Sequence, residues 1–391
     1  MYTQNRFRSQ RFSGRTSRQS RFVKKQAYID PALFVKKAVV QEQEVYTPQN
    51  QFADFLLCEP LKRNISGRGY VTPTPIQDQA IPALLAGKDV VGLAQTGTGK
   101  TAAFLLPLIN KVYLEPNQGV IIVAPTRELA LQIDEEFKLF ARQLDIYSAA
   151  CIGGVSIFGQ KQQLRRRPNF VIGTPGRLKD LEQQRELNFG EYTSIVLDEV
   201  DRMLDMGFVK DIEYMIAKLP KQRQSLFFSA TMPDKIADLA RKFLTNPVTI
   251  SVRTGKTATN VDQDIVKLAG KQKVEVLHEL LIKEGFDKVL VFGRTKWGIE
   301  KLAGALEQRG FRVASIHGNK NQNQRQRALE EFKQSRVQIL LATDIAARGL
   351  DIDNVTHVIN FDLPESYEDY IHRIGRTGRA DKKGCALTFV D

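Results

Sequence analysis

The chain has 391 residues, which is enough for two domains of ordinary size and a tail. Its cysteines, Cys58, Cys151 and Cys385, lie too far apart to indicate a disulfide framework or a zinc site, and no apolar run reaches the roughly 18 residues of a membrane span. The net charge of +13 favours a polyanionic partner, most simply nucleic acid.

The N-terminal region differs in composition from the rest of the chain. Residues 1–29 carry eight Arg and Lys side chains and no Asp or Glu, and Phe7, Phe12 and Phe22 each follow an Arg. We therefore predict a disordered basic tail over residues 1–50. Alternating Arg and Phe suit phosphate contacts and base stacking. A solubilising tail and an organelle transit peptide remain alternatives, although no helical period places the three Phe on one face.

From about Gln51 the sequence becomes globular, with apolar strands alternating with helices. Near-continuous apolar strands predict a parallel sheet covered by helices on both faces, here over residues 51–250. The expected strands are 89–93, 119–125, 146–152, 170–173, 194–197 and 225–228, and the expected helices include 52–61, a segment around 102–106, and 127–142.

A polar stretch over 251–262 indicates a linker, and a second alternating series follows over 263–391. Its expected strands are 289–292, 313–316, 339–342, 357–360 and 386–390, and its expected helices are 297–309 and 322–334. The fold class is therefore α/β, with two parallel-sheet lobes.

A Gly-rich turn lies between the strand 89–93 and the following helix. Such a turn points backbone N–H groups at one spot, at the positive end of the helix dipole, which suits a phosphate. Within it, Lys100 adds a positive charge and the Thr101 hydroxyl can hold Mg²⁺. The residues of this phosphate loop are Ala94, Gln95, Thr96, Gly97, Thr98, Gly99, Lys100 and Thr101. The generic pattern has Gly where Ala94 stands, so an incidental turn is the alternative on this stretch alone.

Three carboxylates follow the strand 194–197. Asp198, Glu199 and Asp201 emerge at the carboxyl end of the sheet, where ligands bind in such folds. Carboxylates suit Mg²⁺, and hydrolysis needs a group that orients the attacking water. An acidic helix start is the structural alternative.

Gln77, after Pro-Thr-Pro-Ile, offers one amide donor and one acceptor, which match the N7 and exocyclic amine of adenine. The aromatic Phe52 lies upstream and could stack on a base. An ordinary helix-start residue is the alternative for Gln77.

Near the end of the chain, His372, Arg373, Arg376 and Arg379 are spaced along one segment. These cations can neutralise charge on a transferring phosphoryl group. A plain nucleic-acid patch is the alternative.

Taken in order, these motifs over residues 52–391 resemble those of DEAD-box RNA helicases of superfamily 2. The resemblance implies two RecA-like lobes that bind ATP and Mg²⁺ between them. Lys100 and Asp198 would handle phosphate and Mg²⁺ together with Thr101, Glu199 would position the water, and Arg376 and Arg379 would act as arginine fingers. Phe52, Gln77, Ala94 to Thr101 and Asp344, near the ribose, would bind ATP. Coupling between hydrolysis and strand separation would fall to Asp201, Ser229, Thr231, His372 and Arg373.

The resemblance also implies RNA contacts over both lobes, mainly to phosphates and 2′-hydroxyls and hence with little sequence preference. The implied RNA-binding residues are Pro125, Thr126, Arg127, Gly153, Gly154, Thr174, Pro175, Gly176, Arg177, Arg325 and Thr343. One residue departs from the family signature, because Val200 stands where the acidic motif has Ala. We expect the site to accommodate it.

We therefore expect an ATP-dependent RNA helicase that locally unwinds short duplexes or remodels RNA–protein complexes. We also expect a cytoplasmic monomer, with ribonucleoproteins as further partners. Two rivals are a processive DNA translocase and an ATP-gated RNA clamp that unwinds little. The sequence ends directly after its last expected strand, where relatives often continue with another helix or tail.

Overall fold

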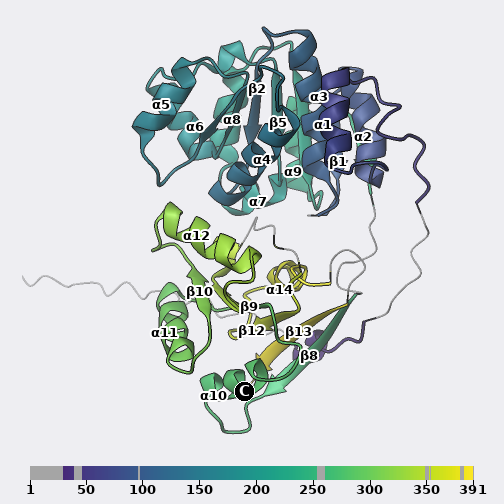
Figure 1. Ribbon diagram of the computed structural model, residues 1–391. Helices are drawn as coiled ribbons and strands as arrows, with labels where there is room; N and C mark the ends of the chain where they lie inside the picture. Colours follow the sequence, from purple (N-terminus) through teal and green to yellow (C-terminus); the bar gives the residue numbers. More distant parts are fainter. Residues whose placement is uncertain are drawn as a thin grey trace, which may run out of the picture.

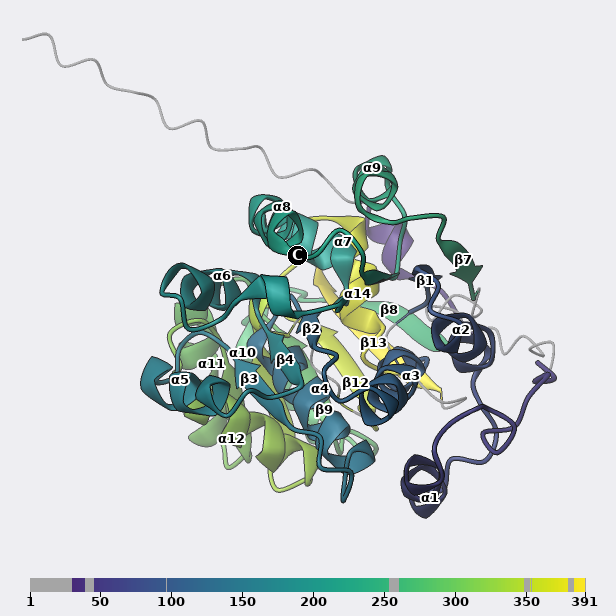
Figure 2. The ribbon, with the colours of Figure 1, turned by 90° about the horizontal axis from the view of Figure 1, so that it is seen from above.

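The computed structural model describes residues 30–38, 46–95, 97–252, 260–347, 352, 354–378 and 383–390. These form two α/β lobes, lobe 1 from Tyr46 to Val252 and lobe 2 from Asn260 to Val390, stacked one above the other in Figure 1. Viewed from above, lobe 1 overlies lobe 2 (Figure 2). The expectation of two parallel-sheet lobes is confirmed. Within the described parts of the chain, no helix is both long and apolar enough to cross a membrane.

Lobe 1 is a seven-stranded sheet in the order β3-β4-β2-β5-β6-β1-β7, and every neighbouring pair is parallel. Side chains of the central strands are buried on both faces, which explains their continuous apolar sequences. The strands are β1 Val90–Leu93, β2 Val120–Val123, β3 Ser148–Cys151, β4 Phe170–Gly173, β5 Ser194–Leu197, β6 Gln224–Ser229 and β7 Val248–Ser251.

Two hydrophobic clusters flank this sheet. Helices α1 to α4 cover one face, and α6 to α9 cover the other. The helices are α1 Glu59–Gly67, α2 Pro75–Leu85, α3 Lys100–Leu114, α4 Arg127–Phe140, α5 Ile157–Arg165, α6 Pro175–Gln183, α7 Val200–Asp205, α8 Val209–Lys218 and α9 Asp234–Phe243, with a 3-10 turn at Phe189–Glu191. Because all strands are parallel, the loops after β1, β2, β4 and β5 emerge at the same edge, where the sequence motifs lie.

Lobe 2 is a six-stranded parallel sheet in the order β10-β11-β9-β12-β13-β8. Helices α12 and α14 cover one face, and α10 and α11 cover the other. The strands are β8 Val261–Lys267, β9 Val289–Phe292, β10 Val313–Ile316, β11 Ile339–Ala342, β12 His357–Asn360 and β13 Gly384–Val390. The helices are α10 Lys273–Leu281, α11 Lys296–Glu307, α12 Gln322–Lys333, α13 Asp344–Ala347 and α14 Tyr367–Ile374.

Some elements differ from the sequence-based expectation. The first helix begins at Glu59 rather than at Phe52, because Pro60 suits the start of a helix while Phe52 and Phe55 pack into the core as part of a loop. The edge strand β8 starts at Val261, inside the stretch expected to be linker, since its polar sequence hides the strand signal. Of that linker, residues 253–259 lie outside the described residues.

The N-terminal region also departs from the expected disorder. Residues 1–29 and 39–45 lie outside the described residues, but Pro31–Phe34 form a 3-10 turn against lobe 2. Lys36 forms an antiparallel bridge with Gln263 of β8, and residues 46–50, at the start of lobe 1, contact Asp78 of α2. Disorder through residue 50 is therefore wrong for residues 30–38, where Phe34 buries its whole side chain in the core of lobe 2, and for residues 46–50, which form hydrogen bonds to Asp78.

Candidate functional site

The phosphate loop joins β1 to α3 at the carboxyl edge of the lobe 1 sheet. Its turn depends on two glycines in the left-handed region, Gly97 at φ 86° and Gly99 at φ 89°. A Cβ on Gly99 would also lie 2.4 Å from the amide nitrogen of Gln77, so only glycine fits there. The buried Lys100 donates from Nζ to the Ala94 carbonyl at 2.8 Å, which holds its ammonium over the loop.

Other members of the loop stabilise the turn or begin the helix. Thr98 donates from its hydroxyl to the Gln95 carbonyl at 2.7 Å. Thr101 lies in the first turn of α3, next to Lys100. Thr96 lies outside the described residues. The loop thus combines the backbone N–H groups of a helix start, a cation and a hydroxyl, which is the chemistry that a polyphosphate requires.

Asp198 and Glu199 follow β5 and are both buried. Burial raises the pKa of Asp198 to about 6; the Lys100 ammonium acts in the opposite direction, and the Glu199 carboxylate adds to the rise. Glu199 has left-handed backbone angles (φ 53°), and its Oε2 lies 3.3 Å from Nε of Arg202. A desolvated carboxylate of raised pKa gains by binding a cation. With the Thr101 hydroxyl, Asp198 therefore fits Mg²⁺, which typically takes only one or two carboxylates beside phosphate oxygens and water.

Val200, the departure from the family signature, opens helix α7. Its side chain is fully buried in the hydrophobic cluster that includes Leu197 and Met203. The two methyl groups that Val200 has in addition to the side-chain carbon of Ala thus fill space in the core behind the carboxylates. The backbone of the motif still begins a helix at this residue.

Asp201 ties the acidic motif to the end of β6. Its Oδ2 accepts hydrogen bonds from the backbone N–H groups of Ala230 and Thr231, both at 3.1 Å, and from the Thr231 hydroxyl at 3.3 Å. The Ser229 hydroxyl in turn accepts from the Asp201 N–H at 3.3 Å. A displacement of α7 would therefore move the Ser-Ala-Thr segment as well.

Gln77 lies in the first turn of α2 and contacts the phosphate loop. Its Oε1 accepts from the Thr74 N–H at 2.9 Å, and its Nε2 donates to the Gly99 carbonyl at 3.1 Å. Thr74 donates to the Thr98 carbonyl at 2.8 Å. The helix-start role that the sequence left as an alternative is therefore present. Adenine recognition by Gln77 stays a prediction.

Phe52 is almost fully buried and packs edge-on against Phe55 and Tyr70, with ring centroids 5.8 and 5.5 Å apart. Its ring thereby supports the segment that precedes α2. Stacking of Phe52 on a base stays a prediction.

In lobe 2, Arg373 of α14 is buried and forms a bidentate pair with Asp344 of α13. Its Nε and Nη2 lie 2.6 and 2.7 Å from the two Asp344 oxygens, and Nη1 donates to Asn360 and to the Asp362 carbonyl. Arg373 thus fixes Asp344 and joins α14 to the ends of β11 and β12. This is a positioning contact that the sequence did not identify.

His372 and Arg376 face lobe 1. Burial lowers the pKa of His372, Arg202 of lobe 1 lowers it further, and Asp201 acts in the opposite direction. Arg202, His372, Arg373 and Arg376 together line a small cavity between the lobes. The motif cations of lobe 2 therefore lie beside the helix that follows Asp198 and Glu199. Arg379 lies outside the described residues.

A cleft of about 490 Å³ gathers most of the expected RNA contacts. Thr126 caps α4, and the Arg127 guanidinium covers Gly153 and Gly154 so closely that a Cβ on Gly154 would lie 2.0 Å from Nη1. The expected residues that line the cleft are Pro125, Thr126, Arg127, Gly153, Thr174, Gly176 and Arg177 of lobe 1 and Arg325 of lobe 2. Pro175 opens α6 beside them, whereas Thr343, directly before α13, does not line the cleft.

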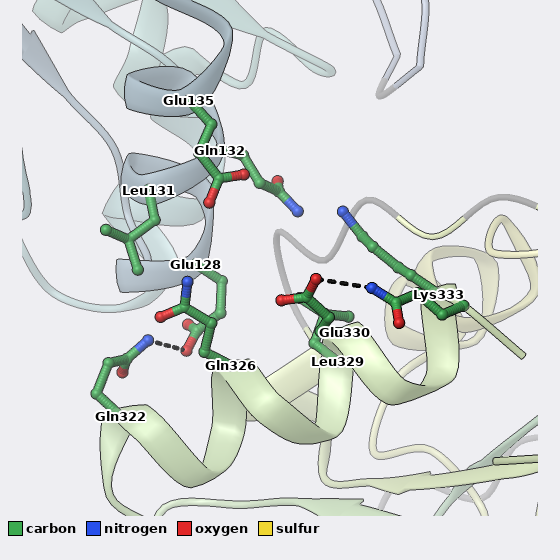
Figure 3. A pocket seen from close by; sticks show the side chains of 10 residues that line it. Glu128, Leu131, Gln132, Glu135, Gln322, Gln326, Leu329, Glu330 and Lys333 are labelled. Carbon is green, nitrogen blue, oxygen red and sulfur yellow. Dashed lines mark hydrogen bonds between the residues drawn. The ribbon is translucent and has the colours of Figure 1, made fainter. Parts of the chain in front are cut away.

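Helices α4 and α12 meet across the gap between the lobes, where they line a groove of about 470 Å³ (Figure 3). Glu128 of α4 is buried, and its Oε1 lies 3.0 Å from Nε2 of Gln322 and 3.0 Å from Nε of Arg325. Sequence reasoning missed Glu128 and Gln322 as site residues. The signal was available, because both lie inside motifs whose other members were assigned.

Comparison with known proteins decides the family. Residues 74–239 match the DEAD/DEAH box helicase family and residues 272–381 match the helicase conserved C-terminal domain. The chain belongs to the DEAD-box family. It is thus an ATP-dependent RNA helicase of superfamily 2 by family membership, and members of this family use ATP with Mg²⁺.

Two curated DEAD-box relatives are the ATP-dependent RNA helicases CshA of Listeria monocytogenes and Bacillus subtilis. The first is 44% identical over 87% of this chain and 66% of its own length, and the second is 45% identical over 87% and 69%. This chain thus spans about two thirds of their length.

Two solved DEAD-box structures share the arrangement of both lobes. S. cerevisiae Dbp5 bound to RNA and ADP BeF3 is 31% identical, with a TM-score of 0.76 over 87% of this chain and 89% of the other. Mss116 bound to ssRNA and AMP-PNP is 29% identical, with a TM-score of 0.78 over 91% and 77%.

Proposed function

We propose that this chain hydrolyses ATP in response to RNA and uses the reaction to unwind short RNA duplexes locally or to remodel RNA–protein complexes. The observation that carries the proposal is the cleft that joins Arg127 and Arg177 of lobe 1 to Arg325 of lobe 2. A strand bound there contacts both lobes. RNA binding and lobe closure are therefore coupled, because the complete cleft exists only when the lobes are together.

In this proposal Lys100 and the loop N–H groups bind the phosphates of ATP, while Asp198 and Thr101 hold Mg²⁺. Bound Mg²⁺ neutralises phosphate charge. Glu199 orients the attacking water, and Arg376 and Arg379 reach across from lobe 2 to the transferring phosphoryl group. Support comes from the burial of Asp198, Glu199 and Arg376 and from the α14 cations beside α7.

Gln77 and Phe52 would bind the base, and Asp344 would lie near the ribose. The phosphates would be surrounded by Ala94, Gln95, Thr96, Gly97, Thr98 and Gly99. Closure of the lobes would be transmitted to the RNA cleft by Asp201, Ser229, Thr231, His372 and Arg373. Two observations support this role: the hydrogen bonds between α7 and the end of β6, and the proximity of His372 to Asp201 across the lobes.

RNA would lie along the cleft with its backbone against the residues named above, including Gly154, Pro175 and Thr343 nearby. Both relatives of known structure are bound to RNA. We further propose a cytoplasmic monomer with ribonucleoprotein partners, and functional units at 51–250 and 263–391 joined through 251–262.

ATP turnover measured without nucleic acid, with single-stranded RNA and with DNA of the same sequence tests the proposal. We expect strong stimulation by RNA and little by DNA. Equal stimulation by duplex DNA would favour the DNA translocase, and turnover indifferent to either polymer would contradict the proposal.

A further inference from the structure

The N-terminal segment before lobe 1 completes the core of lobe 2. Phe34 is fully buried, and its ring lies 4.6 Å, centroid to centroid, from Tyr370, which is fully buried too. The hydrophobic cluster around them includes Ile374 of α14 and Val261 of β8. In Figure 1 the purple segment that contains Phe34 lies beside β8.

Backbone hydrogen bonds hold this segment in place. Lys36 donates from its N–H to the Gln263 carbonyl at 2.9 Å and accepts from the Gln263 N–H at 2.8 Å. Ala38 donates its N–H to Asp262 at 2.9 Å. The Gln263 side chain in turn accepts from the Tyr370 hydroxyl at 3.0 Å. The segment thus contacts Tyr370 twice, directly through Phe34 and indirectly through Gln263.

Tyr370 belongs to α14, which presents His372 to lobe 1 and ends two residues before Arg376. It lies two residues before His372 and six before Arg376, on the side of α14 that is buried against the sheet. The position of α14 relative to its own sheet therefore depends on what fills the space beneath Tyr370. In this chain Phe34 fills part of that space, and it belongs to a segment that precedes lobe 1 in the sequence.

The same segment then crosses to lobe 1. Asp78, next to Gln77 on α2, accepts from the Tyr46 hydroxyl at 2.5 Å and from the Gln49 and Asn50 N–H groups at 2.8 and 3.1 Å. Only seven residues separate the two anchors, so they can lie no more than about 29 Å apart. Docking of Phe34 thereby also limits how far lobe 2 can move from α2.

We propose that Phe34 is a positioning residue for ATP hydrolysis: it holds α14 so that the lobe 2 cations reach the nucleotide on lobe 1. This inference rests on the proposed function. Since ATP would bind mainly to lobe 1, loss of Phe34 should reduce the turnover number rather than the affinity for ATP. A misplacement of about 1 Å can cost on the order of 10²-fold in rate.

The test measures RNA-stimulated ATP turnover of the full chain at saturating RNA, below the melting temperature of every variant. We expect Phe34→Ala to lower kcat about tenfold or more while KM for ATP changes by less than about twofold. Leu33→Ala is the matched control, because Leu33 lies in the same turn but is 50% exposed. It should match the parent chain. Phe34→Leu, which restores most of the buried volume, should recover most of kcat.

A second variant keeps the test informative if Phe34→Ala does not fold. Lys36→Pro leaves Phe34 in the sequence but removes the N–H that pairs with Gln263, so it should release the segment and lower kcat in the same way. A lower melting temperature with kcat equal to that of Leu33→Ala would make Phe34 a core residue only and overturn the inference. If the parent chain itself shows no RNA-stimulated turnover, the proposed function fails and this inference with it.

Discussion

Replacing Glu128 by Gln should weaken the association of the two lobes while leaving the volume of the side chain nearly unchanged. The Glu128 side chain is 4% exposed and that of Arg325 is 13% exposed, so their 3.0 Å contact is largely shielded from water. Burial lowers the pKa of Arg325, and the Glu128 carboxylate acts against that shift. The neutral amide would leave the guanidinium desolvated without its counter-charge.

The magnitude depends on how much free energy Glu128→Gln costs when the lobes are joined and when they are separated. The Glu128–Arg325 contact is an ion pair, and loss of the partner of a buried polar group costs about 1–3 kcal/mol, or more for a charged group. When the lobes separate, Arg325 returns to water, so the penalty applies to the joined arrangement alone. Closure, and with it RNA affinity, should therefore weaken by about 5- to 150-fold.

The assay is the affinity for single-stranded RNA at fixed salt, measured with and without a non-hydrolysable ATP analogue. We expect Glu128→Gln to bind RNA more weakly than the parent chain in the presence of the analogue. Without nucleotide, the RNA affinity should change little. Glu135→Gln is the control, because Glu135 lines the same groove from the same helix but is exposed. It removes the same charge.

The sign of the result discriminates between explanations. Glu128 also lines the proposed RNA cleft, so removal of its negative charge would by itself strengthen RNA binding there. Equal or tighter binding by Glu128→Gln in the presence of the analogue would refute the role of this pair in closure.

Substitutions in the nucleotide site and deletion of the tail should each change a separate measurable property. Glu199→Gln should retain ATP and RNA binding but stall hydrolysis, and an unchanged turnover number would remove Glu199 from its role. Gln77→Ala should narrow the preference for ATP over GTP in turnover; equal preference in parent and variant would leave Gln77 only its contact with the phosphate loop. Because the pKa of Asp198 is raised to about 6, its carboxylate is protonated below that pH, so ATP turnover should fall as the pH drops through about 6. A higher Mg²⁺ concentration should shift this decrease in turnover to lower pH. A pH dependence that does not change with Mg²⁺ concentration would contradict metal binding by Asp198. Deletion of residues 1–29 should flatten the slope of log RNA affinity against log salt by about 3 if four phosphate contacts are lost, and an unchanged slope would exclude the RNA-tether interpretation.

The sequence predicted the elements whose side chains are buried on both faces. Strands such as Phe170–Gly173, Ser194–Leu197 and Ile339–Ala342 coincide with the expected ranges, because a continuous apolar run has few other places to lie. The phosphate loop and the acidic motif could be located for the same reason, since they follow the buried strands β1 and β5.

What the sequence could not predict depends on contacts between distant segments. The strand β8 is polar and lies at an edge, and Phe34 stands in a stretch whose composition indicates disorder. Nothing local to Glu128 or Arg373 identifies Arg325 or Asp344 as its partner. Such pairs become evident only when the sheet order and the juxtaposition of α4 and α12 are known.

The most direct test of the central claim is strand displacement from a short RNA duplex. With ATP and Mg²⁺, the chain should displace one strand, whereas Glu199→Gln should bind the duplex and displace little over repeated turnovers. Rapid RNA-stimulated ATP hydrolysis without displacement of even a short duplex would contradict the helicase account and favour an ATP-gated RNA clamp.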